Sequence, residues 1–363
     1  MRKIAIAATG LASIIAVALF VWVGGATTPG RAGEGARELW VTSQGTDALY
    51  VFRFPQMERL ARIALPAGAQ PHITTFHRGR YAYVGGMGDG TLYVLDADAR
   101  QVVKTLKVAP GGAHQVRVSP DGRTAIVAAV GNRTLTRLAV DESRGTWAAT
   151  GTLSLDELQK APVCTVFGQD GQRAYVSLFP DGLAVVDVSS MTLLGMLATD
   201  GFVACGMIRS ADGSHAVVAS SGSGGHIYTL DLEHGTLVDR GTLGAADWHS
   251  FNMTPDERLG IGTSPHSDEI VLIDLITNPV RKLGTLALTA LPGLSANQPD
   301  ALGGGEPIQG GMLPVSLRAA GQVAVVDLRN MSGRTYTPVV APLGPFNLMT
   351  CMNCAVHGVT VRP

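Results

Sequence analysis

The chain has 363 residues, of which 46% are hydrophobic and only 16% are charged, so it can bury a large core. Its 28 Lys and Arg residues nearly balance its 29 Asp and Glu residues, and the net charge is −1. Because no basic stripe is present, the sequence argues against a surface that binds nucleic acid through its phosphates.

The N-terminal segment differs in composition from the rest of the chain. Arg2 and Lys3 precede an apolar run from Ile4 to about Ala26, which is the layout of a secretory signal and is also long enough to span a bilayer uncut. We expect residues 1–26 to be a signal peptide or an N-terminal membrane anchor, followed by a flexible Gly/Pro-rich spacer at residues 27–37. The body would then be exported to the periplasm or another extracytoplasmic space, and it would touch a membrane only through an uncleaved segment at residues 4–26.

The segment from Ala113 to Asp141 shows the repeating unit of the body. A strand at 115–118 leads into a Ser-Pro-Asp-Gly turn, a β-rich run follows at Thr124–Ala129, and an alternating run from Thr134 to Val140 ends on Asp141. Proline and glycine favour tight turns, and alternating β-branched residues are typical of strands with one buried face.

This unit recurs along the chain at a spacing of roughly 42 to 49 residues, the length of a four-stranded propeller blade. The turn motif appears again at three places: Gln169–Gly171, Ala211–Gly213 and Thr254–Asp256. Strands that end on aspartate follow these turns, at Leu92–Asp96, Leu183–Asp187, Ile227–Asp231, Ile270–Asp274 and Val323–Asp327. We expect these aspartates to hold turns by accepting backbone N–H bonds.

The two ends of the body complement each other. The C-terminal segment His357–Pro363 matches the opening of the unit at His114–Pro120, whereas the body begins at Glu38 with sequences that match the second and third strands. The sequence therefore predicts an all-β, seven-bladed β-propeller over residues 38–363, closed by the C-terminal strand joining the N-terminal blade. Such closure removes unpaired sheet edges.

The Ser-Pro-Asp-Gly turns and the Leu-Tyr-Val-Leu-Asp type strands resemble those of the YVTN-repeat propellers, a WD40-like superfamily that groups YncE-like, lactonase-like and cytochrome d1-like proteins. The resemblance covers roughly residues 38–363. It implies the propeller fold but leaves the function open, because such folds host many chemistries.

Histidine or cysteine recurs at the position just before each inner strand. These side chains are expected to converge on the axis of the ring, and four of the nine histidines occupy the position: His72, His114, His249 and His357, with Cys164 and Cys205 in the two blades between them. Imidazole and thiolate together suit copper or zinc, so we expect a metal site, with copper favoured and a haem less expected.

Cys351 and Cys354 lie just upstream of His357 and extend the candidate site. The segment lacks the c-type haem signature, because Ala355 stands where that signature needs histidine. It would chelate a metal, form a redox dithiol or form a disulfide, and an exported protein favours disulfides. A purely structural role for the histidines, hydrogen-bonded to neighbouring blades, is the competing interpretation.

Three functions remain open. The first is a metal- or metallocofactor-binding propeller, acting as an accessory or electron-transfer subunit with a protein partner or within a membrane complex. The second is a non-enzymatic scaffold that presents loops to a partner. The third is a lactonase-like hydrolase, ranked last because such metal sites favour carboxylates over histidine and cysteine. The chain has no P-loop, no Gly-x-Ser-x-Gly elbow and no His-Glu-x-x-His motif.

Overall fold

The computed structural model describes residues 37–203, 207–221, 225–244, 249–254, 256–264, 269–287, 301–304, 312–317, 321–327, 341–342 and 356–362. All of them lie in one compact unit, Ala36–Pro363. The predicted signal or anchor at residues 1–26 lies outside the described residues. The first strand begins at Arg37, one residue inside the predicted spacer. No helix in these ranges is long and apolar enough to cross a membrane.

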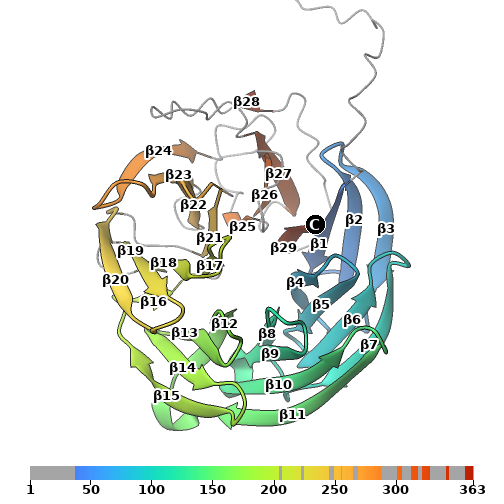
Figure 1. Cartoon of the computed structure of the whole chain (residues 1–363). Helices are drawn as coiled ribbons and strands as arrows, with labels where there is room; N and C mark the ends of the chain where they lie inside the picture. Colours follow the sequence, from blue (N-terminus) through green and yellow to red (C-terminus); the bar gives the residue numbers. More distant parts are fainter. Residues whose placement is uncertain are drawn as a thin grey trace, which may run out of the picture. The chain divides into compact units, whose positions relative to one another are not determined.

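The described strands form seven antiparallel sheets, which we call the first to seventh blades and which follow one another around a central opening (Figure 1). The first blade is ordered β29-β1-β2-β3. Its strands are β29 (Val356–Val361), β1 (Arg37–Ser43), β2 (Ala48–Phe54) and β3 (Glu58–Ala64). The prediction of an all-β propeller is therefore confirmed.

The second, third and fourth blades each consist of four consecutive strands, from the innermost to the outermost. The second contains β4 (Pro71–His77), β5 (Tyr81–Gly86), β6 (Thr91–Asp96) and β7 (Gln101–Lys107). The third contains β8 (Ala113–Val118), β9 (Thr124–Ala129), β10 (Thr134–Asp141) and β11 (Thr146–Ser154). The fourth contains β12 (Ala161–Phe167), β13 (Arg173–Phe179), β14 (Leu183–Asp187) and β15 (Thr192–Leu197). Two short 3-10 turns, Val130–Asn132 and Asp156–Leu158, accompany them.

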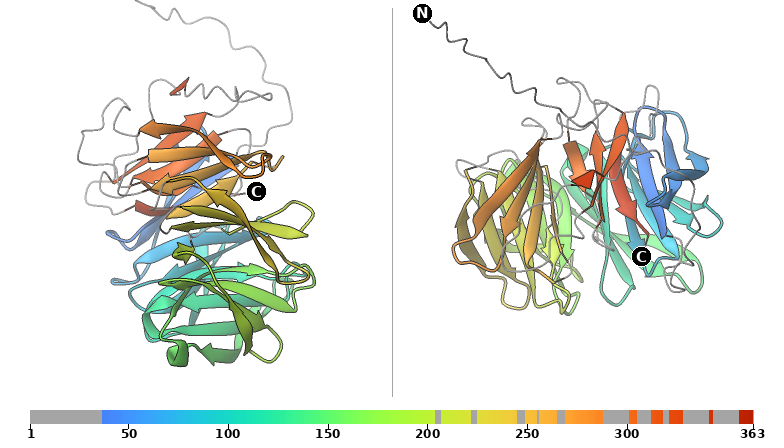
Figure 2. Two further views of the ribbon diagram at one scale, coloured as in Figure 1. Left: turned by 90° about the vertical axis from the view of Figure 1, so that its left-hand side faces the viewer. Right: turned by 90° about the horizontal axis from the view of Figure 1, so that it is seen from above.

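The remaining blades complete the ring. In the fifth, β16 (Phe202–Val203) and β17 (Ile208–Arg209) both pair with β18 (His215–Ser221), followed by β19 (His226–Asp231) and β20 (Leu237–Thr242). The sixth contains β21 (Ser250–Met253), β22 (Leu259–Ser264), β23 (Glu269–Asp274) and β24 (Arg281–Ala287). The seventh contains β25 (Ala301–Gly304), β26 (Met312–Leu317), β27 (Gln322–Asp327) and β28 (Ala341–Pro342). Figure 2 shows the strands crossing the thickness of the ring.

The core lies between neighbouring blades. Middle strands such as β5, whose six residues are all buried, are covered on both faces and read as continuous apolar runs, whereas the outermost strand β7 is mostly exposed. One cluster joins Tyr83 and Val94 of the second blade to Val116 and Leu138 of the third. Another joins Leu39 and Val359 of the first blade to Met312 and Val323 of the seventh. Packing between blades therefore continues across the point of closure.

The repeat chemistry predicted from the sequence is present in the turns. Ser119 donates to Asp121 Oδ1 at 2.6 Å, and Asp121 Oδ1 also accepts the backbone N–H of Arg123 at 3.0 Å. Gly122 follows with a φ of 78°, a conformation that favours glycine. At the strand ends, Asp96 accepts the N–H of Ala99 at 2.9 Å, and Asp274 accepts that of Ile276 at 3.0 Å. The expected role of these aspartates as turn acceptors is confirmed.

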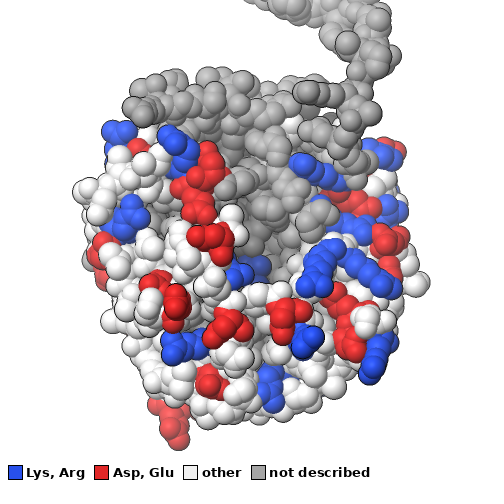
Figure 3. Space-filling model, viewed as in Figure 1, with Lys and Arg blue, Asp and Glu red and all other residues white. Residues whose placement is uncertain are grey.

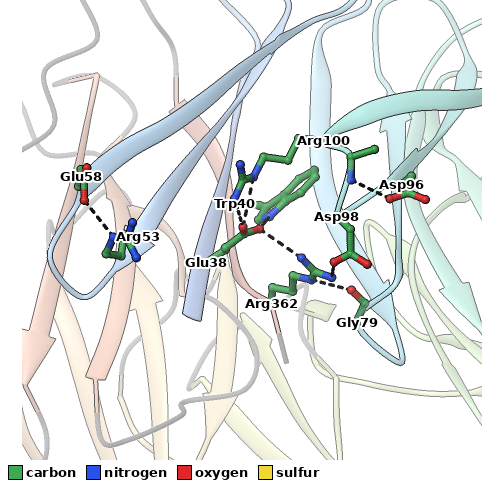
Figure 4. A network of polar contacts seen from close by, with 10 residues as sticks. Glu38, Trp40, Arg53, Glu58, Gly79, Asp96, Asp98, Arg100 and Arg362 are labelled. Atoms are coloured by element: carbon green, nitrogen blue, oxygen red, sulfur yellow. Dashed lines mark hydrogen bonds and ion pairs between the residues drawn. The ribbon is translucent and has the colours of Figure 1, made fainter. Parts of the chain in front are cut away.

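The C-terminal strand closes the first blade as predicted. β29 pairs antiparallel with β1, with Leu39 opposite Val361 and Trp40 opposite Thr360. A polar network fastens this junction (Figure 4): Glu38 accepts hydrogen bonds from Trp40 and Arg100, and Arg362 binds Asp98 and the carbonyl of Gly79. The ends of the body are therefore joined both by the sheet and by side chains of the second blade.

Candidate functional site

Four histidines from four blades lie together at the start of the inner strands. The ring centroid of His72, on β4, lies 3.8 Å from that of His114 on β8 and 3.7 Å from that of His357 on β29. The ring of His249, which directly precedes β21, lies 5.7 Å from that of His357. We call these four residues the axial histidine cluster. The shared repeat position thus places all four within reach of one another.

A β-bulge accompanies the recurrent position in four blades. The pairing register shifts around His72 between Pro71 and Thr74, and around His114 between Ala113 and Gln115. The pairing of β29 with β1 shifts beside His357, and that of β12 with β13 shifts around Cys164. A bulge leaves one residue out of the ladder and re-aims its side chain, so it frees these positions to point away from the regular sheet faces.

One hydroxyl group holds two of the histidine-bearing strands together. Thr42 Oγ1 on β1 donates to the carbonyl of His72 and accepts the N–H of Gly358 at 2.7 Å. A Cβ atom at Gly358 would lie 2.5 Å from the carbonyl oxygen of His72, so only glycine lets β29 approach β4 this closely. The contact between His72 and His357 therefore depends on Thr42 and Gly358.

Three of the four histidines are buried, and burial keeps two of them uncharged. His72, His114 and His357 are 3%, 7% and 8% exposed, whereas His249 is half-buried. Burial lowers the pKa of His114 to about 3, with repulsion from His249 adding to the effect. Burial, together with repulsion from His114, His357 and His249, places the pKa of His72 well below its ordinary value. His72 and His114 are therefore neutral imidazoles at physiological pH, which is the form that binds metals.

The cysteines divide between described and undescribed segments. Cys164, on β12, is buried, and its Sγ lies 4.0 Å from Nδ1 of His114. Cys164 is disulfide-bonded, so the alternative of a disulfide holds for this residue, and its sulfur is not a thiolate available to a metal. The other three predicted cysteines, Cys205, Cys351 and Cys354, lie outside the described residues.

The rings of His114 and His357 are each tilted by 41° to the ring of His72 and lie too close to it to share a metal in this arrangement. Two imidazoles that share one metal, with metal–nitrogen distances of about 2.0–2.1 Å, have centroids about 5 Å apart. The His249–His357 separation of 5.7 Å is close to that value, but the 3.7 Å and 3.8 Å separations from His72 are shorter. Accordingly, within the described ranges no group of three or more His, Cys, Asp or Glu side chains is arranged to hold a metal ion.

The described histidines outside the cluster have carboxylate partners. His226 contacts Asp239 at 2.9 Å and Asp200 at 3.2 Å, and the exposed His234 contacts Asp231 at 2.9 Å. His215 lies 3.3 Å from Glu257. In contrast, His72 and His114 have no carboxylate within ion-pair distance among the described residues. This difference in partners separates these two histidines from those outside the cluster.

Sequence reasoning missed the residues that support the cluster. Besides Thr42 and Gly358, Ser177 on β13 accepts the N–H of Cys164 at 3.0 Å, and Thr263 on β22 contacts the hydroxyl of Ser250 at 3.0 Å. These three hydroxyls stand on the second strand of their blades, opposite the start of the inner strand. In the sequence, a small hydroxyl residue near the end of an otherwise apolar second strand was the feature that could have indicated these supporting residues.

Comparison with known proteins supports the propeller fold. The family described as "Lactonase, 7-bladed beta-propeller" matches residues 34–177, which is less than half of the chain. A putative 6-phosphogluconolactonase from Bacteroides fragilis has a TM-score of 0.66 at 13% identity, over 90% of this chain and 98% of that one. A second, from Bacteroides uniformis, has a TM-score of 0.58 at 18% identity, over 69% and 82%.

Hydrazine synthase from Kuenenia stuttgartiensis is also similar, with a TM-score of 0.56 at 15% identity, over 72% of this chain and 78% of that one. At such identities these likenesses establish the β-propeller and do not single out the YncE-like or cytochrome d1-like branch of the predicted superfamily.

Proposed function

We propose that this protein binds one copper or zinc ion through the axial histidine cluster, and that it serves as an accessory or electron-transfer subunit rather than an independent enzyme. The observation that carries the proposal is the convergence of imidazoles from four blades, with three of the four buried. Four separate segments of the chain each contribute one histidine to the cluster.

The donor set suits this class of metal. Neutral imidazole is a preferred ligand of copper and zinc, and its affinity falls when a proton competes for the nitrogen. The low pKa of His114 and His72 removes that competition near neutral pH. Nδ1 of His72 is buried and has no hydrogen-bond partner among the described residues, so its lone pair or its N–H is unsatisfied. A buried unsatisfied ring nitrogen is a reason to expect a ligand.

Binding would require the imidazole of His72 to turn away from its present position between the rings of His114 and His357. Its position in a bulge makes this rotation less costly, because the side chain is not packed in the regular ladder. When bound, the ion would supply Lewis acidity or one-electron chemistry. The protein would supply four imidazoles and a largely water-excluded surrounding.

We also propose that the propeller works outside the cytoplasm, where a protein or membrane partner would meet it. The apolar run that follows Arg2 and Lys3 supports export. The disulfide at Cys164 supports the same location, since structural disulfides persist in oxidising compartments.

The test is a calorimetric titration of the full chain with Cu²⁺ and Zn²⁺, paired with the visible spectrum of the Co²⁺ form. We expect one equivalent to bind, and His72→Phe, which keeps the ring volume but removes both nitrogens, to weaken binding by roughly a hundredfold. His234→Gln is the matched control, because His234 is exposed and does not occupy the position just before an inner strand. Equal binding by the two variants would contradict the proposal.

A lactonase-like hydrolase is the second candidate. It is favoured by the family match at residues 34–177 and by the two Bacteroides proteins named as putative 6-phosphogluconolactonases. The test is hydrolysis of 6-phosphogluconolactone, measured by base consumption at constant pH. Hydrolysis faster than the spontaneous rate in the parent, but not in His114→Phe, would support this function. Absence of hydrolysis above the spontaneous rate in the parent would rule out the lactonase-like candidate.

A further inference from the structure

A separate cavity opens toward the central channel near the other ends of the inner strands. It has a volume of about 280 Å³ and is lined by residues of β8, β12, β17 and β21, the inner strands of four successive blades. A gap between two blades would draw on two sheets only. The contribution of four inner strands therefore places this cavity at the axis rather than in a cleft between neighbouring blades.

The cavity is distinct from the axial histidine cluster. Arg117, which lines the cavity, stands three residues after His114 on β8, and a strand advances about 3.3 Å per residue. The two sites are therefore separated by roughly 10 Å along the channel. None of the four clustered histidines is among the lining residues.

The lining combines positive charge with apolar walls. Arg117 and Arg209 supply guanidinium groups and Asn252 supplies an amide, whereas Phe167, Met207 and Met253 supply apolar surface. No Asp or Glu lines the cavity within the described part of the chain. On the face seen in Figure 3, acidic and basic side chains are interspersed among uncharged ones, so the excess of positive charge is confined to the lining of the cavity.

Arg209 has unused hydrogen-bonding capacity. Its Nη2 donates to the carbonyl of Gly213 at 3.4 Å, a long bond, and its buried Nε has no hydrogen-bond partner among the described residues. It forms no ion pair with the described acidic groups. Arg209 is half-buried, and leaving its buried N–H without a partner or counter-charge is costly, so an anion in the cavity would satisfy it.

We infer that this cavity binds a small organic anion, with a carboxylate or phosphate group held by Arg209 and Arg117 and a short apolar body held by Phe167, Met207 and Met253. Guanidinium groups pair with both kinds of oxyanion through parallel N–H bonds. The volume lies just below the usual range of about 300–1,000 Å³ for ligand pockets, so the ligand is small. The inference does not rest on the proposed metal site.

The test is calorimetric titration of the full, metal-free chain with four probes: hexanoate, phenyl phosphate, inorganic phosphate and the neutral hexanamide. We expect at least one organic anion to bind, hexanamide to bind at least roughly tenfold more weakly than hexanoate, and inorganic phosphate to bind more weakly than phenyl phosphate. Whether hexanoate or phenyl phosphate binds more tightly then distinguishes a carboxylate ligand from a phosphate ester.

Two variants at Arg209 sharpen the result. Arg209→Gln should weaken the anionic probe by roughly tenfold or more, and Arg209→Lys, which keeps the charge but loses the planar fork, should fall between it and the parent. Arg59→Gln, an exposed position on β3, is the matched control. His72→Phe should leave anion binding intact, which separates this inference from the metal proposal. Near-UV circular dichroism confirms that each variant is folded.

Equal affinity for hexanoate and hexanamide, unchanged affinity in folded Arg209→Gln, or no binding of either organic anion would overturn the inference.

Discussion

Arg362 Nη1 lies 3.6 Å from Glu38 Oε2, so the residue that directly follows β29 faces the start of the body where the ring closes. Both side chains are largely buried, at 19% and 11% exposure. Arg362 also donates to the carbonyl of Gly79 at 2.6 Å and pairs with Asp98, which links the first blade to the second. These contacts fix the C-terminal strand that carries His357.

Removing the contacts that Arg362 makes with Glu38, Asp98 and Gly79 should destabilise the ring. We expect Arg362→Ala to lower the free energy of unfolding by about 2 kcal/mol, because Glu38 stays buried with less compensation. Arg53→Ala, which breaks the exposed pair with Glu58 at 2.9 Å, should cost less than about 1 kcal/mol. Urea-induced unfolding measures both variants. An equal loss of unfolding free energy in the two variants would show that closure of the ring does not depend on the contacts of Arg362.

The approach of β29 to β4 should tolerate no added methyl group. Gly358→Ala places a Cβ atom 2.5 Å from the carbonyl oxygen of His72, so we expect a loss of about 1–3 kcal/mol and a displaced His357. Gly195→Ala is the matched control, since a Cβ there meets nothing within 4 Å. Urea unfolding reports the stability and metal titration reports the displacement. If both alanines behave alike, the close approach is not what positions His357.

The hydroxyl of Thr42 should matter independently of its volume. Thr42→Val keeps the shape but leaves the buried N–H of Gly358 without the acceptor that now lies 2.7 Å away, so we expect a loss of about 1–3 kcal/mol. Thr105→Val, at an exposed position on β7, should change the stability by less than about 0.5 kcal/mol. The comparison uses chemical denaturation, and a neutral Thr42→Val would argue against the bridging role.

Acid should destabilise the protein through the axial cluster. The pKa of His114 is lowered to about 3, first by burial and then by His249, whereas an unfolded histidine titrates near 6.5. The unfolded chain therefore binds a proton that the folded chain does not. Stability is highest above about pH 6.5 and decreases as the pH falls toward about 3, by about 1.4 kcal/mol per pH unit for each such histidine.

The variant His114→Phe removes this titration. We expect the free energy of unfolding to depend less steeply on pH between about 6.5 and about 4 than in the parent, whereas the exposed His234→Gln should leave that loss intact. Unfolding midpoints at several pH values provide the measurement. A parent-like slope in His114→Phe would mean that this residue is not buried in its neutral form.

The sequence predicted the ring because its pattern is repeated. The turn at Ser119–Gly122 and the strands ending on Asp96, Asp187 and Asp231 mark the period, and the match of His357–Pro363 to His114–Pro120 predicted the closing strand that pairs with β1. The same repeat position predicted which histidines converge, since equivalent positions in a ring meet at its axis.

Other features depend on contacts between distant segments and left little trace in the sequence. The bulges at His72 and His114 follow from pairing register, and the contact between the rings of His72 and His357 follows from the close approach that Gly358 permits. The partnering of Thr42 with Gly358 joins residues far apart in the chain. The disulfide at Cys164 could not be singled out from the sequence, because composition alone does not distinguish a thiolate ligand from a bridged sulfur.

The central claim is that the axial histidine cluster holds a metal, and elemental analysis tests it most directly. The full chain, purified without chelator or an affinity metal, would be analysed for copper, zinc and iron beside His72→Phe and His234→Gln. We predict about one equivalent of copper or zinc in the parent and in His234→Gln, and a loss of most of that metal in His72→Phe. Metal-free parent protein that also fails to take up copper or zinc on addition would contradict the account and leave the cluster a structural element of the ring.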